Sequence, residues 1–424
     1  PDLHKKSGIK RGKYSSRAPP SMSSSSPAAH TSNGVFGLFC LGSFLLSVSY
    51  GTTFLLAKVL SAHGGSESDA GTIISAAMVS TFAAVIFSGH LTDLFGAPKS
   101  IAAAAVLLAA ACLGFSSVQT FGVATLIFGL LLGLGWGVFY TLGPIIVAMI
   151  IEPVRRVKYF ALLSGSMMTG SGAGPLLGRV SEALGYPVET AFMAASLASL
   201  LGGLAFIAIG PMIKRQSTRI GPVSVCKITP RAAVSVLRSR AVFAIVMVGL
   251  GGAIFGGLSS FQTSYATLNH LDYSLFFLGF MSAAISCRLL IAGFIVKRDP
   301  YWMACVLSAL IVLSVLMFMF SVTSSATYVL AAVTLGVGYG LTYSVINGLA
   351  ANEAPTGYTS QSLVLFSLAY FVGVFGFPWL AGHIIVSYGI PTLLSIILAI
   401  AVCNWSITAG RLLWRTRSAN CARA

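Results

Sequence analysis

The stretch GLGWGVFYT, Gly133–Thr141, returns 203 residues later as GVGYGLTYS, Gly336–Ser344. Glycines and aromatic residues keep their places: Gly133, Gly135, Trp136, Gly137 and Tyr140 recur as Gly336, Gly338, Tyr339, Gly340 and Tyr343. Pro175 returns as Pro378 at the same distance, and Gly89 and Gly293 differ by 204. A nearly constant offset across several apolar runs indicates that the chain is a duplication of two similar halves.

Each half contains six long apolar runs. A bilayer span needs about 20 mostly apolar residues. Such runs lie at about 34–58, 70–90, 98–118, 121–151, 158–183 and 190–213, and again at about 241–268, 273–296, 300–322, 326–350, 359–386 and 390–414. Only 8% of residues are charged, against about a quarter in soluble domains. The sequence therefore predicts an all-α membrane protein with 12 transmembrane helices in two pseudo-symmetric six-helix bundles, an arrangement that places the site between the halves.

The formal charge of +16 reflects topology rather than nucleic-acid binding. Lys and Arg gather in three stretches, whereas Glu67, Asp69, Glu182, Glu189 and Asp272 fall in the alternate loops. An excess of Lys and Arg marks cytoplasmic loops. We therefore predict a disordered basic cytoplasmic tail at 1–33, a bundle at 34–213, a basic cytoplasmic linker at 214–240, a second bundle at 241–414 and a cytoplasmic tail at 415–424.

Several chemistries are disfavoured by the composition. The seven cysteines are scattered, which favours neither a disulfide framework nor a metal site, and no cofactor is expected. The acids are isolated, so the paired carboxylates or the His–Asp pair of a membrane acyl- or glycosyltransferase are missing. The Ser/Pro-rich, acid-poor tail is similar in composition to a transit peptide, although a disordered cytosolic tail fits better. We expect a monomer in a plasma membrane or a bacterial inner membrane.

The turn GHLTDLFGAPKS, Gly89–Ser100, interrupts the apolar pattern between the second and third runs. Gly89 permits close helix packing, and Gly96 permits a turn with positive φ. Asp93 supplies an anion that a helix N-terminus attracts, and Lys99 supplies a local counter-charge. This loop is expected to act as a latch between helices on the cytoplasmic face.

The same loop resembles the signature of the major facilitator superfamily, Gly-x-Leu-x-Asp-x-x-Gly-x-x-Lys/Arg. Gly89, Leu91, Asp93, Gly96 and Lys99 match it, and a weaker copy in the second half keeps Gly293 but has Lys297 in place of the aspartate. The resemblance covers about residues 34–414. It implies a secondary transporter that works by alternating access, in which the loop latch helps to hold one of the two states.

The fifth run carries a second resemblance. GSGAGPLLG, Gly170–Gly178, is similar to the exporter-associated signature Gly-x-x-x-Gly-Pro-x-x-Gly-Gly: Gly170, Gly174, Pro175 and Gly178 match, but Arg179 replaces the last glycine. Glycines four apart allow close helix approach, and proline kinks a helix. The resemblance implies a drug- or metabolite-exporter-like branch and favours efflux.

Charges within the spans are few. The arginine that family exporters often carry before the GLG of the fourth helix is replaced by Gly129, and no acid lies deep in a span. Protons remain a candidate coupling ion, without the usual buried carboxylate. Arg288 lies about 13 Å inside the eighth span at 1.5 Å per residue. It is either a counter-charge for an anionic substrate group or a snorkelling side chain.

The substrate cavity is assigned partly by resemblance, because the first, fourth, seventh and tenth helices line it in this family. Tyr339, Tyr343 and Asn347 share one helical face at i, i+4 and i+8. The alternative for the aromatic residues is a packing or interfacial role. The expected lining residues are Tyr50, Trp136, Tyr140, Gln262, Arg288, Tyr339, Tyr343 and Asn347.

These observations predict a secondary active transporter of the antiporter kind, and not an enzyme, that moves a small organic molecule outward. The alternatives are an uptake permease for a sugar or organic anion and, from other classes, a transporter-like sensor or a membrane enzyme. The expected partners are the small-molecule substrate and the lipid bilayer.

Overall fold

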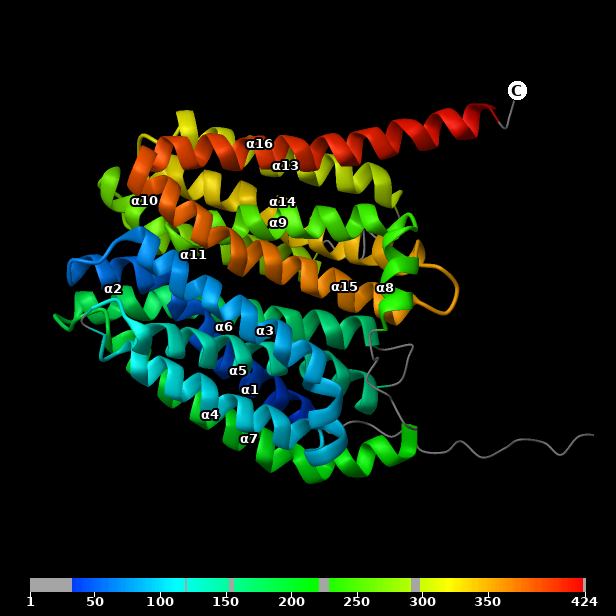
Figure 1. Ribbon diagram of the computed structural model, residues 1–424, viewed down its shortest axis with the longest axis horizontal. Coiled ribbons are helices and arrows are strands. Elements are labelled where there is room, and N and C mark those ends of the chain that lie inside the picture. The colour runs from blue at the N-terminus through cyan, green and yellow to red at the C-terminus, as the bar shows by residue number, and fades with distance from the viewer. Residues whose placement is uncertain (1–32, 119, 152–155, 221–228, 291–297, 422–424) are drawn as a thin grey trace, which may run out of the picture.

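The computed structural model describes residues 33–118, 120–151, 156–220, 229–290 and 298–421 (Figure 1). The predicted tail at 1–33, part of the linker, and the second-half loop with Gly293 and Lys297 lie almost wholly outside these ranges. The first half comprises α1 (Asn33–Thr52), η1 (Thr53–Leu55), α2 (Leu56–Ala62), α3 (Glu67–Phe95), α4 (Ala97–Phe115), α5 (Val123–Ile150), α6 (Arg156–Ala183) and α7 (Thr190–Ile220). The second comprises α8 (Pro230–Leu237), α9 (Ala241–Ser260), α10 (Gln262–Leu268), α11 (Ser274–Leu290), α13 (Pro300–Phe320), α14 (Ser325–Asn352), α15 (Thr359–Phe371), the π-helical η3 (Val372–Gly376) and α16 (Phe377–Cys421).

Nine stretches of the described residues are long and apolar enough to cross a membrane. The stretch Thr359–Thr416 has 58 residues, which is long enough for two spans, and the chain turns within it at Gly389, where φ is 81°. Helix α6 has the length of a span, with 28 residues, but many small polar side chains. Helix α11 has 17 described residues and stands in the place of the eighth span. The chain is thus an all-helical membrane protein, as predicted.

The two bundles repeat each other in their packing as well as in their sequence. A Cβ at Gly133 would lie 2.1 Å from the Ala77 carbonyl oxygen of α3, and one at Gly336 would lie 2.4 Å from the Phe280 carbonyl oxygen of α11. Only glycine permits so close an approach of two helix backbones. The corresponding glycines of α5 and α14 therefore fix corresponding helix pairs.

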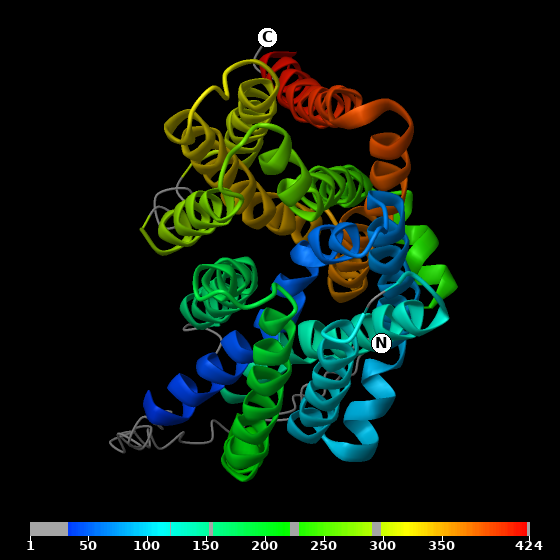
Figure 2. The ribbon, with the colours of Figure 1, turned by 90° about the vertical axis from the view of Figure 1, so that its left-hand side faces the viewer.

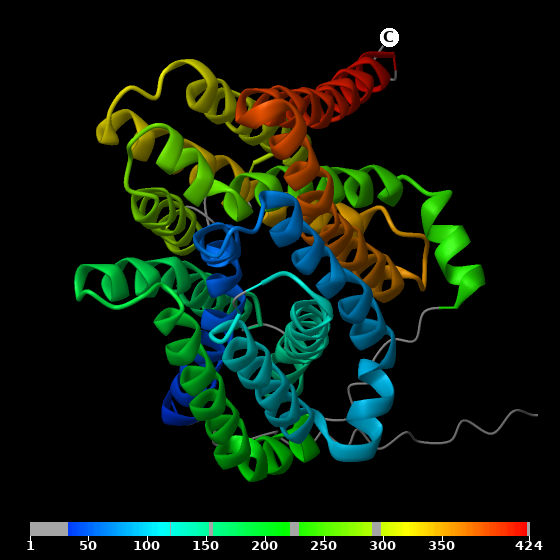
Figure 3. The ribbon, with the colours of Figure 1, turned by 60° about the vertical axis from the view of Figure 1, so that its left-hand side comes forward.

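The same correspondence holds one turn further along. Gly137 faces Ala84 of α3, with 2.7 Å between the two Cβ positions, and Gly340 faces Ala284 of α11 at 2.9 Å. Figures 2 and 3 show the two bundles meeting along one seam. The duplication predicted from sequence thus appears as a structural repeat.

The two ends of the molecule differ in charge and in contacts. The end that carries α8 and the C-terminus, on the right in Figure 1, is called the basic end, and it includes Arg231, Arg238, Arg240 and Arg415. The end at which α2 and α10 lie is called the opposite end. Helix α8 runs across the direction of the long helices at the basic end.

Candidate functional site

Two tyrosines at equivalent positions of the repeats meet between the halves. The hydroxyl oxygens of Tyr140 on α5 and Tyr343 on α14 lie 2.7 Å apart, and either hydroxyl can donate. Both helices reach this point because their glycines pack tightly on neighbouring helices of their own half. The sequence repeat therefore places a polar contact at the seam.

An aromatic cluster surrounds this tyrosine pair. In the first half, the ring of Tyr50 stacks on Trp136 with centroids 4.5 Å apart. From the second half, Phe371 meets Tyr140 edge to face at 5.0 Å, and Tyr370 contacts the rings of both Tyr140 and Tyr343, at 6.2 and 5.5 Å. The cluster thus closes the seam with side chains from both halves.

Tyr370 and Phe371 were not among the expected lining residues, because the resemblance directed attention to the first, fourth, seventh and tenth helices. They end α15, directly before the π-helical segment η3. A π-helical turn shifts the face that the following side chains present and is frequent at functional sites. The aromatic run in Ala369–Trp379 was the signal available in the sequence.

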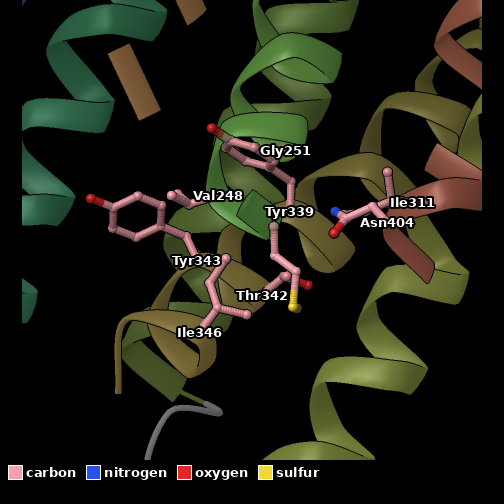
Figure 4. Close-up of a pocket in the computed structure, with 9 residues that line it drawn as sticks. Val248, Gly251, Ile311, Tyr339, Thr342, Tyr343, Ile346 and Asn404 are labelled. Atoms are coloured by element: carbon pink, nitrogen blue, oxygen red, sulfur yellow. The ribbon is translucent and has the colours of Figure 1, made fainter. Parts of the chain in front are cut away.

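Tyr339 lies beside this cluster within the second half. Its ring stacks on Phe255 with centroids 5.0 Å apart. Its hydroxyl is buried and has no hydrogen-bond partner among the described residues, and the same holds for Thr342 Oγ1 and Asn404 Oδ1. These side chains surround a cavity of about 10 Å³ (Figure 4). That volume suits a single water molecule.

Arg288 of α11 joins the two halves. Its Nε donates to the Gly340 carbonyl oxygen at 3.0 Å, and its terminal nitrogen donates to Ser164 Oγ of α6. The guanidinium carbon lies 6.0 Å from the centre of the Tyr343 ring. No carboxylate among the described residues forms an ion pair with it. Arg288 therefore places an uncompensated positive charge beside the aromatic cluster.

Two expected lining residues lie apart from this group. Gln262 is buried and accepts a hydrogen bond of 2.8 Å from Tyr328, which lies 15 residues before Tyr343 on α14, or about 22 Å along the helix. Asn347 is half-buried and lies one turn beyond Tyr343. The structure brings together Tyr50, Trp136, Tyr140, Arg288, Tyr339 and Tyr343, but leaves Gln262 and Asn347 outside the group.

The loop expected to act as a latch joins α3 and α4 at the basic end. Gly89 is buried, and Gly96 has a φ of 80°. Ser100 Oγ donates to the carbonyl oxygens of Gly96 and Leu91, at 3.0 and 3.1 Å, which fixes the turn. Asp93 is exposed in the last turn of α3, and among the described residues neither it nor Lys99 forms an ion pair.

The exporter-like motif forms a tight contact between α6 and α1. A Cβ at Gly170 would lie 2.2 Å from the Phe44 carbonyl oxygen, and one at Gly174 would lie 2.3 Å from the carbonyl carbon of Gly51. Gly178 packs on Leu55 in the same row. Pro175 lies inside α6. These residues hold two helices of the first half together.

A polar network closes the seam at the opposite end. Arg179 of α6 forms an ion pair with Asp272, with 2.6 Å between Nε and Oδ2. The Tyr273 hydroxyl donates to Glu182 at 3.0 Å, and Lys58 pairs with Glu182 at 2.5 Å. Arg179, which departs from the exporter signature, thus contributes an ion pair between the halves.

The surroundings of this network set the pKa of its loop groups. Burial alone raises the pKa of the Asp272 carboxyl, but hydrogen bonds from Ser274 and Arg179 outweigh it, so the pKa lies below its ordinary value of 3.8. Burial, followed by the charge of Glu182, raises the pKa of the Tyr273 phenol. Asp272 is therefore ionised and Tyr273 is neutral at physiological pH.

No group of three or more His, Cys, Asp or Glu in the described ranges could hold a metal ion. The duplicated bundle, with a polar and aromatic site between its halves, defines the class of secondary transporters. The sequence profile of the Major Facilitator Superfamily matches residues 39–378. The chain belongs to this superfamily, and it is a secondary transporter of small molecules rather than an enzyme.

Solved structures of other proteins share the fold of this chain. The human organic anion transporter MFSD10 (TETRAN) is 16% identical, with a TM-score of 0.64 over 88% of this chain and 98% of that chain. The peptide transporter POT in complex with sulfate is also 16% identical, with a TM-score of 0.70 over 90% of this chain and 94% of that chain. None of the curated protein sequences matches. At these identities the likeness shows the fold alone.

Proposed function

We propose that the protein exports an amphipathic organic anion, with its apolar body against the aromatic cluster and its anionic group at Arg288. The observation that carries this proposal is the position of Arg288, which lies beside Tyr343 and has no carboxylate partner in the described part of the chain. Arg288 is half-buried, and no described carboxylate balances its charge. A partly desolvated charge is costly, and an anionic ligand would relieve that cost. The similarity to the structure of an organic anion transporter supports the same class.

Substrate binding would act on a contact that joins the halves. Arg288 donates to Ser164 of α6 across the seam. An anionic group bound to Arg288 would compete with this hydroxyl and so change the energy of one arrangement of the halves. A ligand drives a conformational change only when it binds the two states differently. The competition with Ser164 supplies such a difference.

The orientation follows from the charge distribution. Excess Lys and Arg marks the cytoplasmic side, so the basic end and both termini would face the cytoplasm of a plasma membrane or a bacterial inner membrane. The polar network at Arg179 and Asp272 would then seal the outer side. In this orientation an exporter would take its substrate from the cytoplasm at the basic end and release it at the opposite end.

The exporter-like motif supports export, and the loop at Asp93 is assigned to the state in which the basic end is closed. The close contact of Gly170 and Gly174 with α1 fits the exporter-like branch, because a tightly packed α6 limits leakage through the first half. Asp93 is exposed in the present conformation. We assign its latch role, with Gly89, Gly96 and Lys99, to the state that closes the basic end.

The described part of the chain has no carboxylate deep inside a span, so the usual buried group for proton coupling is missing there. The described carboxylates lie at helix ends or in loops, from Glu67 at the start of α3 to Glu353 at the end of α14. Protons are the candidate coupling ion of an antiporter. Flux measured with and without an imposed pH gradient tests that assignment separately from substrate class.

The test uses the purified full chain in proteoliposomes. Three compounds that share the same aromatic body are compared: the first bears a carboxylate, the second an amide and the third an amine. We expect the carboxylate to be transported fastest. Arg288→Gln should reduce carboxylate flux by about ten- to 150-fold, since a hydrogen bond to a charged group contributes about 1.5–3 kcal/mol. Arg288→Lys keeps the charge and should retain part of the flux.

Two results would contradict the proposal. One is equal flux of the carboxylate and the amide in the native protein, which would remove the anionic preference. The other is full carboxylate flux in Arg288→Gln. Direction is tested separately, because inside-out membrane vesicles should accumulate the compound and right-side-out vesicles should not.

A further inference from the structure

A second cavity lies in the second half at the basic end, away from the seam. Its volume is about 630 Å³, and it is bounded by the beginnings of α9 and α13 and by the C-terminal part of α16. One wall carries Arg240, Arg411, Trp414 and Arg415, whereas Phe243 and Ile407 form an apolar part. The cavity therefore combines three guanidinium groups, called the rim, with an apolar surface.

The three guanidinium groups of this cavity are not equivalent. Arg411 forms an ion pair with Glu353, and both side chains are about nine-tenths buried. Arg415 forms an ion pair with Asp299. Arg240 is exposed, stacks on Trp414 with its guanidinium carbon 4.7 Å from the ring centre, and forms no ion pair within the described ranges. Arg240 thus leaves one unbalanced positive charge at the rim.

Aromatic rings hold the paired arginines in place. Arg411 lies between the rings of Phe243 and Tyr301, at 5.1 and 5.0 Å, and Arg415 lies 4.7 Å from the Tyr301 ring. The Tyr301 hydroxyl donates to Glu353. Guanidinium groups that are stacked and paired lose little further freedom when a ligand binds. The rim is therefore a prearranged surface.

The position of helix α8 suggests that this cavity lies at the level of the membrane surface. Helix α8 crosses the bundle direction at the basic end (Figure 1), with Ala232 and Val236 buried and Arg231 and Arg238 exposed. Val234 and Leu237 of the same helix remain exposed, at 49% and 46%, which suits a helix that lies in the plane of the interface. Arg240 follows it within three residues, and Trp and Tyr side chains are enriched at this level of membrane proteins.

The apolar part of the cavity opens toward lipid. Phe243 and Trp414 are exposed at 43% and 55%, and a Cβ at Gly410 would meet no atom within 4 Å. The surface beside the rim can therefore accept a hydrocarbon chain. A soluble anion such as phosphate would use the rim but leave this apolar surface unoccupied.

We propose that this cavity binds an anionic phospholipid of the leaflet at the basic end. Its phosphate would lie on Arg240, and one acyl chain would lie along Phe243, Ile407 and Gly410. Arginine binds phosphate with two parallel hydrogen bonds, and basic residues near a membrane surface attract anionic lipids. The site is separate from the seam and does not depend on the transport proposal.

The proposal is tested by native mass spectrometry of the purified full chain titrated with phosphatidylglycerol or phosphatidylcholine of identical acyl chains. We expect one phosphatidylglycerol to bind at least about tenfold more tightly than phosphatidylcholine. Arg240→Gln should abolish most of that preference. Arg231→Gln, which removes an exposed arginine at the same end outside the cavity, should leave it intact.

A second variant separates the acyl chain from the charge. Gly410→Leu fills the apolar part, leaves every arginine in place, and meets open space at its Cβ. It should weaken phosphatidylglycerol binding while thermal stability stays native. Equal losses in Arg231→Gln and Arg240→Gln, or unchanged binding in Gly410→Leu, would overturn the assignment. Competition by soluble glycerol phosphate at equal concentration would identify a free phosphate as the ligand and would also overturn it.

Discussion

The hydroxyl oxygens of Tyr140 and Tyr343 lie 2.7 Å apart, although 203 residues separate the two positions in the chain. They are equivalent positions of the two repeats. Points related by a twofold operation can touch only close to its axis, so this hydrogen bond marks the pseudo-twofold axis of the bundle. The two bundles therefore meet at this axis, and either hydroxyl can donate the hydrogen bond.

Loss of either hydroxyl is expected to weaken this conformation. Tyr140→Phe and Tyr343→Phe should each lower the population in which the halves touch at this point by about two- to tenfold, because one hydrogen bond contributes about 0.5–1.5 kcal/mol. The double variant should add little, since both changes remove the same bond. Distances between spin labels on the two halves measure the population.

Tyr388→Phe is the matched control, because Tyr388 is largely exposed and remote from the pair. It should leave the label distances unchanged. Additive effects of the two single variants would show that the two hydroxyls act independently and that their contact contributes nothing to closure.

The repeat made the tyrosine pair accessible to prediction, whereas other parts of the site were not. Equal spacing in GLGWGVFYT and GVGYGLTYS is enough to place Tyr140 and Tyr343 at matching depths of their two helices. The partner of Arg288 could not be found in this way, because Ser164 belongs to the other half and has no distinctive neighbours in sequence. Such contacts depend on how the two bundles tilt.

Gln262 was predicted to line the site but lies outside it, whereas Tyr370 was not predicted and lies inside it. Gln262 follows α9 and has the polarity of a lining residue, but it bonds to Tyr328 far from the cluster. Tyr370 lies in the predicted eleventh run, and only the π-helical turn after α15 explains how its neighbours continue along the seam. Hydrophobic periodicity in the sequence does not predict which face the side chains present after such an irregular turn.

Exchanging the two charged residues of the ion pair at the opposite end, Arg179 and Asp272, should preserve closure of that end. Arg179→Asp or Asp272→Arg alone places like charges across the seam and should favour opening of that end by a few-fold, since exposed pairs have small effects. The double exchange should restore the native label distances. Failure of the exchange to restore closure would mean that shape, rather than charge, seals this end.

The same pair predicts how closure depends on pH. The pKa of Asp272 is lowered from 3.8, so its contribution is present above the ordinary value and is lost as pH falls through the lowered value. Closure should therefore show no change from Asp272 between pH 5 and 8. Asp272→Asn should be indistinguishable from the native protein only at pH values below the lowered pKa, as checked by label distances across the acid range.

The close packing of α6 on α1 leaves no room for a methyl group at Gly174. A Cβ at Gly174 would lie 2.3 Å from backbone atoms of Gly51, and overpacking costs about 1–3 kcal/mol. Gly174→Ala should lower the unfolding temperature in detergent. Gly165→Ala in the same helix meets no atom within 4 Å and should leave that temperature unchanged or raise it slightly. Equal unfolding temperatures for the two variants would contradict the contact.

Asp93 should matter for transport without mattering for the stability of the present conformation. Its side chain is exposed and forms no ion pair among the described residues, so Asp93→Asn should unfold at the native temperature. If Asp93 closes the basic end in the other state, the variant should lose most of its flux in proteoliposomes and should remain closed at the opposite end in label-distance measurements. Leu94→Asn, at an exposed neighbouring position on α3, controls for a general effect of polarity at this turn. Native flux in Asp93→Asn would confine this loop to a structural role.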